Sequence, residues 1–298
     1  MRLFQLISFL LCFLTSTAQA ATLVLVLGEG KPHREFQEVL SEALRDSSWR
    51  ILAITQEPSG AQTASPDLIV TIGSDALRKT LQNNPSQPIL AALLTRQSYD
   101  RALNDFVTTP RRISAVFLDQ PPSRQALFIR HLLPDAKRVG MLVGTDTRTQ
   151  APRFQQAMNQ RGLRLEQEEV ENESVILPTL NGLISRVDLL LAIPDTNLYN
   201  RATLKSVLIT TLRSQKPVIG FSESMVNAGA LAAIHTTPTQ AAKQTAQLIQ
   251  NLGSALPAPQ NANTFTLSIN QSVAQSLGIK LSDEAMLLKV LSSEGETR

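Results

Sequence analysis

The chain has 298 residues, of which 43% are hydrophobic and 18% charged, and its 28 Lys and Arg side chains exceed its 25 Asp and Glu side chains by three. The basic residues are scattered, so the sequence lacks the clustered positive charge of a nucleic-acid-binding face, and we expect no nucleic-acid partner. The length suffices for two lobes of ordinary size. The single cysteine, Cys12, lies near the start of the chain, which excludes disulfides and thiolate metal sites from the rest.

The first twenty residues are typical of a secretory signal peptide. Arg2 supplies positive charge, residues 3–14 are apolar, and Ala18-Gln19-Ala20 has the small residues that a signal peptidase recognises. Cys12 follows a leucine rather than a small residue, which argues against a lipid anchor. No later segment is apolar for long enough to span a membrane. We therefore expect cleavage after about Ala20 and a soluble periplasmic protein with 27 basic and 25 acidic side chains.

Apolar runs and helical patterns alternate in the first part of the chain. Strands are predicted over residues 22–27, 49–55, 68–72, 89–94 and 113–118. A helix is predicted over residues 34–46, where Phe36, Val39, Leu40 and Leu44 recur at helical spacing, and a short one over 76–82. Residues 58–66 are rich in Ser, Gly, Pro and Thr, which indicates a loop.

A break at Pro121-Pro122-Ser123 precedes a second round of the same alternation. Strands are predicted over residues 139–143, 163–167, 187–193, 217–220 and 264–269, with a further strand ending near His235. Helices are predicted over residues 123–133, with Ser123 as N-cap, and over 152–161, 177–185, 238–252 and 271–277. Another helix carries Leu204, Leu208 and Leu212 on one face. Gly162 is expected to end the helix over residues 152–161. Residues 255–263 are predicted to be a turn, and the tail from Ser292 to be loose.

This alternation predicts an α/β fold with two doubly wound parallel-sheet lobes around a ligand cleft. In such sheets the loops at the carboxyl ends of the strands meet at one edge, where ligands bind.

Five segments resemble the periplasmic substrate-binding components of ABC transporters, in the branch with a type 1 binding-protein fold. They are LFIRHLLPDAKRVGMLVG (127–144), PDTN (194–197), KPVIGFSESMVNAGALAAI (216–234), LSINQSVAQSLGIKL (267–281) and, more loosely, IVTIGSDALRK (69–79). The resemblance implies a chain that crosses three times between lobes. One lobe would comprise residues 21–117 with about 236–262, and the other 118–235 with about 263–298.

Two stretches depart from the branch of this family that binds aromatic amino acids. Residues 115–125 read AVFLDQPPSRQ where that branch has a Gly-rich turn, and residues 236–240 read TTPTQ where it has a glycine. Both changes fall near the expected cleft. The resemblance implies a small-molecule ligand and an ABC permease or other membrane partner, and the departures leave the ligand and the role in transport open.

Polar residues at the strand ends are the candidate ligand contacts. They are Gly28, Glu29, Gly73, Ser74, Asp75, Thr95, Arg96, Gly144, Thr145, Asp195, Thr196, Asn197, Ser222 and Glu223. Free N–H groups at the helix starts suit a ligand carboxylate, and Asp195 or Glu223 is a candidate for receiving an ammonium group. The alternative is that Ser74, Thr196 or Asn197, and Ser222 only cap helices. Arg96 is either a carboxylate clamp or a solvated loop charge.

Other chemistries find less support in the sequence. His33, His131 and His235 are far apart and lack metal-ligand spacing, so we expect no metal. Gly28-Glu29-Gly30 lacks the third glycine of a dinucleotide site, and we expect no cofactor. Ser222 lies in a motif that resembles a nucleophile elbow without its second glycine, so we expect no enzyme activity.

We therefore expect a monomeric solute-binding protein that captures a small polar, amino-acid-like molecule for an ABC importer. A ligand-sensing adaptor for a membrane receptor or sensor kinase is the second hypothesis. A hydrolase that uses Ser222 is the third.

Overall fold

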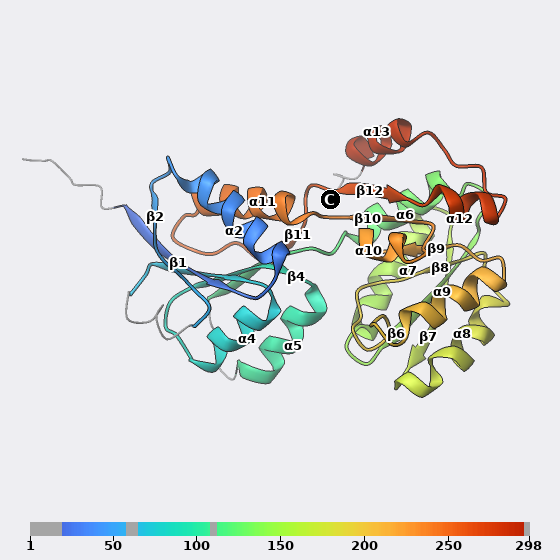
Figure 1. Cartoon of the computed structure of the whole chain (residues 1–298), viewed down its shortest axis with the longest axis horizontal. Helices are drawn as coiled ribbons and strands as arrows, with labels where there is room; N and C mark the ends of the chain where they lie inside the picture. Colours follow the sequence, from blue (N-terminus) through green and yellow to red (C-terminus); the bar gives the residue numbers. More distant parts are fainter. Residues whose placement is uncertain (1–19, 58–64, 108–111, 295–298) are drawn as a thin grey trace, which may run out of the picture.

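The computed structural model describes residues 20–57, 65–107 and 112–294, which form two six-stranded sheets covered by helices (Figure 1). Most of the predicted signal peptide and most of the predicted loop at 58–66 lie outside the described residues. Within these ranges, every helix is too short or too polar to cross a membrane.

The N-terminal sheet has the strand order β11-β5-β4-β3-β1-β2, and all its neighbouring strands run parallel. Its strands are β1 (Ala21–Leu27), β2 (Trp49–Thr55), β3 (Leu68–Ile72), β4 (Ile89–Leu94), β5 (Ile113–Phe117) and β11 (Gln260–Asn261). Alternate residues of a strand point to opposite faces. The buried residues of one face therefore pack on α2 (Lys31–Leu44) and α11 (Pro238–Gln250), and those of the other on α4 (Ser74–Gln82) and α5 (Arg96–Phe106).

The C-terminal sheet has the order β12-β10-β9-β8-β6-β7. Its strands are β6 (Arg138–Gly144), β7 (Arg164–Val170), β8 (Leu189–Leu191), β9 (Val218–Gly220), β10 (Ala232–His235) and β12 (Thr266–Ile269). Only β12 is antiparallel to its neighbour, with His235 opposite Thr266 and Ala232 opposite Ile269. This strand enters beside the carboxyl end of β10 and therefore runs back along it.

Helices cover both faces of the C-terminal sheet. One hydrophobic core joins it to α6 (Pro122–Leu132), α7 (Ala151–Gln160), α12 (Gln271–Ser276) and α13 (Glu284–Glu294). The core on the other face contains α8 (Ile176–Ile184), α9 (Leu204–Arg213) and α10 (Glu223–Asn227). Short 3-10 turns, η1 (Arg148–Gln150) and η2 (Glu173–Val175), precede α7 and α8. The predicted fold class, with its two doubly wound and mainly parallel sheets, is confirmed.

Several local predictions were wrong or incomplete. Helices α5 and α10 and strand β11 were not predicted, because they are short or strongly polar segments. The tail from Ser292 was expected to be loose, but α13 includes Ser292 and buries Leu287 and Leu291 against the core that contains α6. Ser123 does not cap α6, because Pro121 holds that position and Pro122 begins the helix, where no N–H donor is needed.

The chain passes between the sheets after β5, after β10 and after β11, and we call these three passages the crossovers. Two hydrogen bonds join them: Gln120 Nε2 donates to Thr236 Oγ1 (2.6 Å), and Thr236 Oγ1 donates to the carbonyl of Thr264 (2.9 Å). The division into lobes at 21–117 with 236–262, and at 118–235 with 263–298, stays a prediction. The strand membership of the two sheets supports it.

Candidate functional site

Eleven of the fourteen residues predicted to contact a ligand line three pockets at the carboxyl ends of the strands, and Gly73, Asp195 and Glu223 line none of these. A pocket of about 480 Å³ at the N-terminal sheet is lined by Gly28, Glu29, Ser74 and Asp75. A second pocket, of about 360 Å³ at the C-terminal sheet, is lined by Gly144, Thr145, Thr196 and Asn197. A third, of about 240 Å³ between the sheets, is lined by Thr95, Arg96 and Ser222.

The third pocket, which we call the crossover cavity, receives residues from both sheets and from the crossovers. The crossovers and the strand ends beside them supply Leu118, Asp119, Gln120, His235, Thr236 and Asn261. The N-terminal sheet adds Thr95 and Arg96, and the C-terminal sheet and its helices add Pro122, Gln125, Gln150, Arg153, Phe154, Ile193, Pro194, Phe221, Ser222 and Ile234. A small molecule in this cavity would contact both sheets at once.

Positive charge enters the crossover cavity from both sides. Arg96 begins α5, and its guanidinium lies over the ring of Phe117, 4.3 Å from the centroid. Arg153 lies in the first turn of α7, on the other sheet. Helices α5, α6 and α7 all begin at the cavity wall, and helix N-termini carry partial positive charge. The cavity is therefore suited to an anionic group such as a carboxylate. Arg96 was predicted to be either a carboxylate clamp or a solvated loop charge. Its packing on Phe117 holds the side chain at the cavity and thus favours the clamp.

Asp119 supplies negative charge to the same cavity. Its carboxylate accepts a hydrogen bond from the backbone N–H of Arg96 (2.8 Å). Burial raises the pKa of Asp119 to about 6, and the backbone bond and the charge of Arg96 oppose that rise. A carboxylate at a desolvated position is stabilised by a cationic partner. The cavity thus offers separate anion-binding and cation-binding groups.

His235 forms part of the wall beside Ser222. Its Nε2 lies 2.9 Å from Ser268 Oγ, and burial lowers its pKa, an effect that the charge of Glu223 opposes. Ser222 caps α10, because its side chain accepts from the backbone N–H of Met225 (3.2 Å). His235 therefore contacts Ser268, and Ser222 contacts the backbone of α10. Among the residues that the structure describes, Ser222 and His235 form no hydrogen bond with each other. Glu223 itself is exposed on α10.

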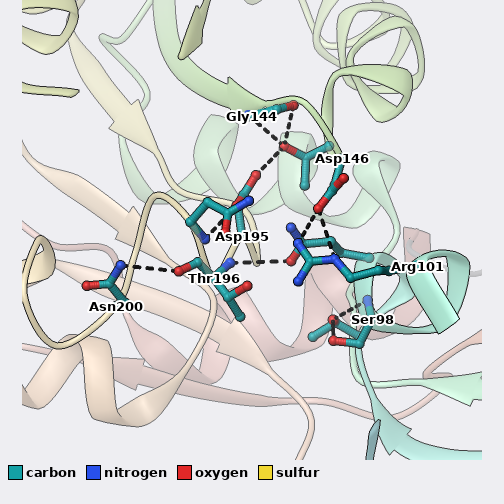
Figure 2. Close-up of polar contacts among 11 residues, drawn as sticks. Ser98, Arg101, Gly144, Asp146, Asp195, Thr196 and Asn200 are labelled. Atoms are coloured by element: carbon teal, nitrogen blue, oxygen red, sulfur yellow. Dashed lines mark hydrogen bonds and ion pairs between the residues drawn. The ribbon is translucent and has the colours of Figure 1, made fainter. Parts of the chain in front are cut away.

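Next to the second pocket, at the C-terminal sheet, the carboxylate of Asp195 is buried. It accepts from Thr147 Oγ1 (2.6 Å) and from the backbone N–H of Asn197 (2.9 Å). A Cβ at Gly144 would lie 2.7 Å from Asp195 Oδ2, so only glycine allows this approach. Figure 2 shows this group of contacts. Asp195 is 2% exposed, and its hydrogen bonds lie within the protein. Its role as ammonium receptor stays a prediction.

At the N-terminal sheet, two glycines enclose the imidazole of His33. A Cβ at Gly73 would lie 2.3 Å from its Nε2, and one at Gly28 would lie 2.8 Å from the same atom. Gly73 also has a φ of 97°, which side chains rarely adopt, and it holds the N-cap position of α4. The alternative prediction, that Ser74 caps α4, was therefore wrong.

Two contacts connect α5 to the C-terminal sheet (Figure 2). The backbone N–H of Thr196 donates to Gln97 Oε1 (3.3 Å), and Arg101 pairs with Asp146. No helix begins at Thr196 or Asn197, so the expectation that either caps one was wrong. Thr95 does act as a cap, because its Oγ1 accepts from the N–H of Ser98 (3.2 Å).

Most residues of the crossover cavity were not among the predicted ligand contacts, and those missed include the polar side chains of Asp119, Gln125, Arg153 and Asn261. Asp119 directly follows β5 and its neighbour Leu118, so the strand-end pattern contained a signal for it. The other three lie inside helices or in a segment predicted as a turn. Among the described residues, no group of three or more His, Cys, Asp or Glu could hold a metal ion.

Residues 51–292 match the family model described as ABC transporter substrate binding protein. Similar solved structures include the L-Trp complex of an ABC domain from Streptococcus pneumonia, with 22% identity, a TM-score of 0.61 and coverage of 91% of this chain and 98% of the other. A ligand-free, open substrate-binding protein with adhesive properties from Clostridium difficile has 14% identity, a TM-score of 0.67 and coverage of 89% and 97%. A conserved domain protein from Vibrio cholerae has 17% identity, a TM-score of 0.60 and coverage of 91% and 98%. A search of curated proteins gives no match.

Proposed function

The chain belongs to the ABC transporter substrate-binding protein family, and from that premise we propose that it captures an amino-acid-like molecule in the crossover cavity. The observation that carries this proposal is the presence of both cationic and anionic side chains in one small cavity. Arg96 and Arg153 offer two cationic groups, and Asp119 offers a carboxylate. A zwitterion with a carboxylate and an ammonium group complements both.

The remaining wall supports a ligand with an apolar part. Phe154, Ile193, Phe221 and Ile234 line the cavity beside the charged groups. Binding sites for small molecules commonly combine an apolar wall with a few polar groups that orient the ligand. A cavity of about 240 Å³ accommodates a molecule of amino-acid size. The similar structure that holds L-Trp is consistent with this ligand class, although its identity of 22% supports the fold alone.

The physiological setting follows from the same proposal. An amino-terminal signal peptide would export the chain to the periplasm, where the protein would deliver its ligand to an ABC permease as a monomer. Catalysis is not required, because the cavity residues bind and orient a ligand. Contacts from both sheets would favour a bound arrangement in which they enclose the ligand.

A thermal-shift screen of the protein without its signal peptide tests the proposal. The panel contains the twenty L-amino acids, short peptides, sugars and nucleosides. At 100 times Kd, a ligand of the folded state adds about 2.7 kcal/mol of stability, which for a chain of this size raises Tm by roughly 5 °C or more. We expect that shift with one or more amino acids.

Two variants make the screen specific to the cavity. Arg153→Ala removes a cation from the wall and should abolish most of the shift. Arg148→Ala is the matched control, because Arg148 is an exposed arginine of the preceding turn that pairs with Glu169. A full shift with Arg153→Ala, or a shift produced only by sugars or nucleosides, would contradict the proposal.

A further inference from the structure

Two side-chain amides in the crossover cavity hold buried oxygens that lack a hydrogen-bond partner among the described residues. They are Gln125 Oε1, on a residue that is 3% exposed, and Asn261 Oδ1. Both residues line the cavity. An unsatisfied buried acceptor costs about 1–3 kcal/mol, and native structures contain few of them. A reorientation of either amide toward the cavity would let its oxygen accept a hydrogen bond from a bound molecule.

A contact between chain neighbours of Gln125 and Asn261 holds their two segments together. Gln125 lies in the first turn of α6, and Asn261 ends β11, which pairs with β5 in the other sheet. Arg124 Nη1 donates to the carbonyl of Ala262 (3.0 Å), so residues adjacent to Gln125 and to Asn261 are directly bonded. The carbonyl of Asn261 accepts a hydrogen bond from Gln244 Nε2 (3.1 Å), which holds β11 against α11.

Three protein donors of the crossovers and α6, namely Gln120 Nε2, Thr236 Oγ1 and Arg124 Nη1, are committed to other acceptors. Gln120 Nε2 donates to Thr236 Oγ1, and that hydroxyl donates to the carbonyl of Thr264. Arg124 Nη1 also donates to Gln120 Oε1 (2.7 Å). Asp119, which lines the same cavity, adds carboxylate oxygens and no donor while it is ionised. The crossover side of the cavity thus offers two amide oxygens and a carboxylate as acceptors.

We propose that Gln125 and Asn261, together with Asp119, form the subsite for a protonated amino group of the ligand. An ammonium carries three N–H donors, which matches three acceptor groups from three separate segments. This inference rests on the proposed function and adds a specificity rule to it. The protein should bind an α-amino acid and reject the 2-hydroxy and 2-oxo acids with the same side chain, because those analogues leave the buried acceptors unpaired.

Isothermal titration calorimetry tests the rule with matched ligands. The probes are the twenty L-amino acids and the 2-hydroxy and 2-oxo acids with the same side chains. For the wild type, we expect the best amino acid to bind at least about 100-fold more tightly than either analogue. Equal affinity for the amino acid and its analogues would overturn the inference and leave the proposed function standing. Absence of binding by every probe would overturn both.

Variants identify the residues that set the difference. Gln125→Leu removes the acceptor and should weaken amino-acid binding by about tenfold or more while leaving the weak binding of the hydroxy acid unchanged. Gln125→Glu and Asn261→Asp keep acceptor oxygens at both positions and should retain amino-acid binding. The Glu and Asp variants also serve if the Leu variant fails to fold by circular dichroism.

A matched substitution separates this role from general effects on the cavity. Gln150→Leu changes another glutamine of the same wall and should affect the amino acid and the hydroxy acid alike. If Gln125→Leu also weakens both ligands equally, or if Gln125→Glu loses amino-acid binding, the subsite is not where we place it.

Discussion

Replacement of Asp119 by Asn should stabilise the ligand-free protein at neutral pH. The pKa of Asp119 is raised by burial from 3.8 to about 6, and such a rise corresponds to about 3 kcal/mol of unfavourable free energy for the charged form. Solvent in the cavity screens part of this cost, so we expect Asp119→Asn to raise the free energy of unfolding by about 2 kcal/mol at pH 7.5. The Asn side chain can still accept the hydrogen bond from the backbone N–H of Arg96.

The pH dependence follows from the direction of the shift. Because the folded state has the higher pKa, it binds more protons than the unfolded state between about pH 4 and pH 6. The contribution of Asp119 to stability therefore improves as the pH falls through that window. At pH 4 the wild type and Asp119→Asn should differ by less than about 0.5 kcal/mol. Arg96 and Asp100 are the charged groups that influence Asp119, and both are present in the two proteins.

Urea denaturation followed by circular dichroism at pH 7.5 and pH 4 measures the effect. Asp105→Asn, at an exposed position on α5, is the matched control and should be close to neutral at both pH values. If Asp119→Asn has the same free energy of unfolding as the wild type at both pH values, Asp119 is not held as a desolvated carboxylate. The same variant should bind an amino acid more weakly at pH 7.5, since the ammonium group loses its charged partner.

Two further predictions concern the contacts in Figure 2. Gly144→Ala should lower the free energy of unfolding by about 1–3 kcal/mol in the same denaturation assay, because the new Cβ would lie 2.7 Å from Asp195 Oδ2. The control Gly182→Ala, whose new Cβ meets no atom within 4 Å, should not lower it. If Gly144→Ala leaves the free energy of unfolding unchanged, Asp195 can move. A double-mutant cycle on Arg101 and Asp146, whose side chains are 41% and 35% exposed, should give a coupling of about 0.5 kcal/mol that disappears in 1 M NaCl; a coupling that resists salt would indicate a desolvated pair.

The sequence predicted the regular core of the fold well. Residues 89–94 are all apolar and residues 68–72 are apolar except for Thr71, and both segments form buried strands with the predicted bounds. Such runs identify strands that are covered on both faces. Helix α5 was missed because most of its positions are polar and only Gln97, Tyr99 and Ala102 are buried. Its burial depends on the sheet beneath it rather than on its own composition.

The candidate site was predicted only in part. Thr95, Arg96 and Ser222 line the crossover cavity, whereas most of the other candidates surround two pockets at the outer strand ends. Gln125 and Asn261 line the same cavity only because two crossovers pass each other. Residues that far apart in the chain carry no shared local pattern, so their common position became visible only in the folded structure.

The most direct test of the account is the crystal structure of the protein with the amino acid that gives the largest thermal shift. We predict that the ligand occupies the crossover cavity, with its carboxylate beside Arg96 and Arg153 and its ammonium group within hydrogen-bond distance of Asp119, Gln125 and Asn261. A ligand bound instead at Gly28 and Ser74, or at Gly144 and Asn197, would contradict the central claim.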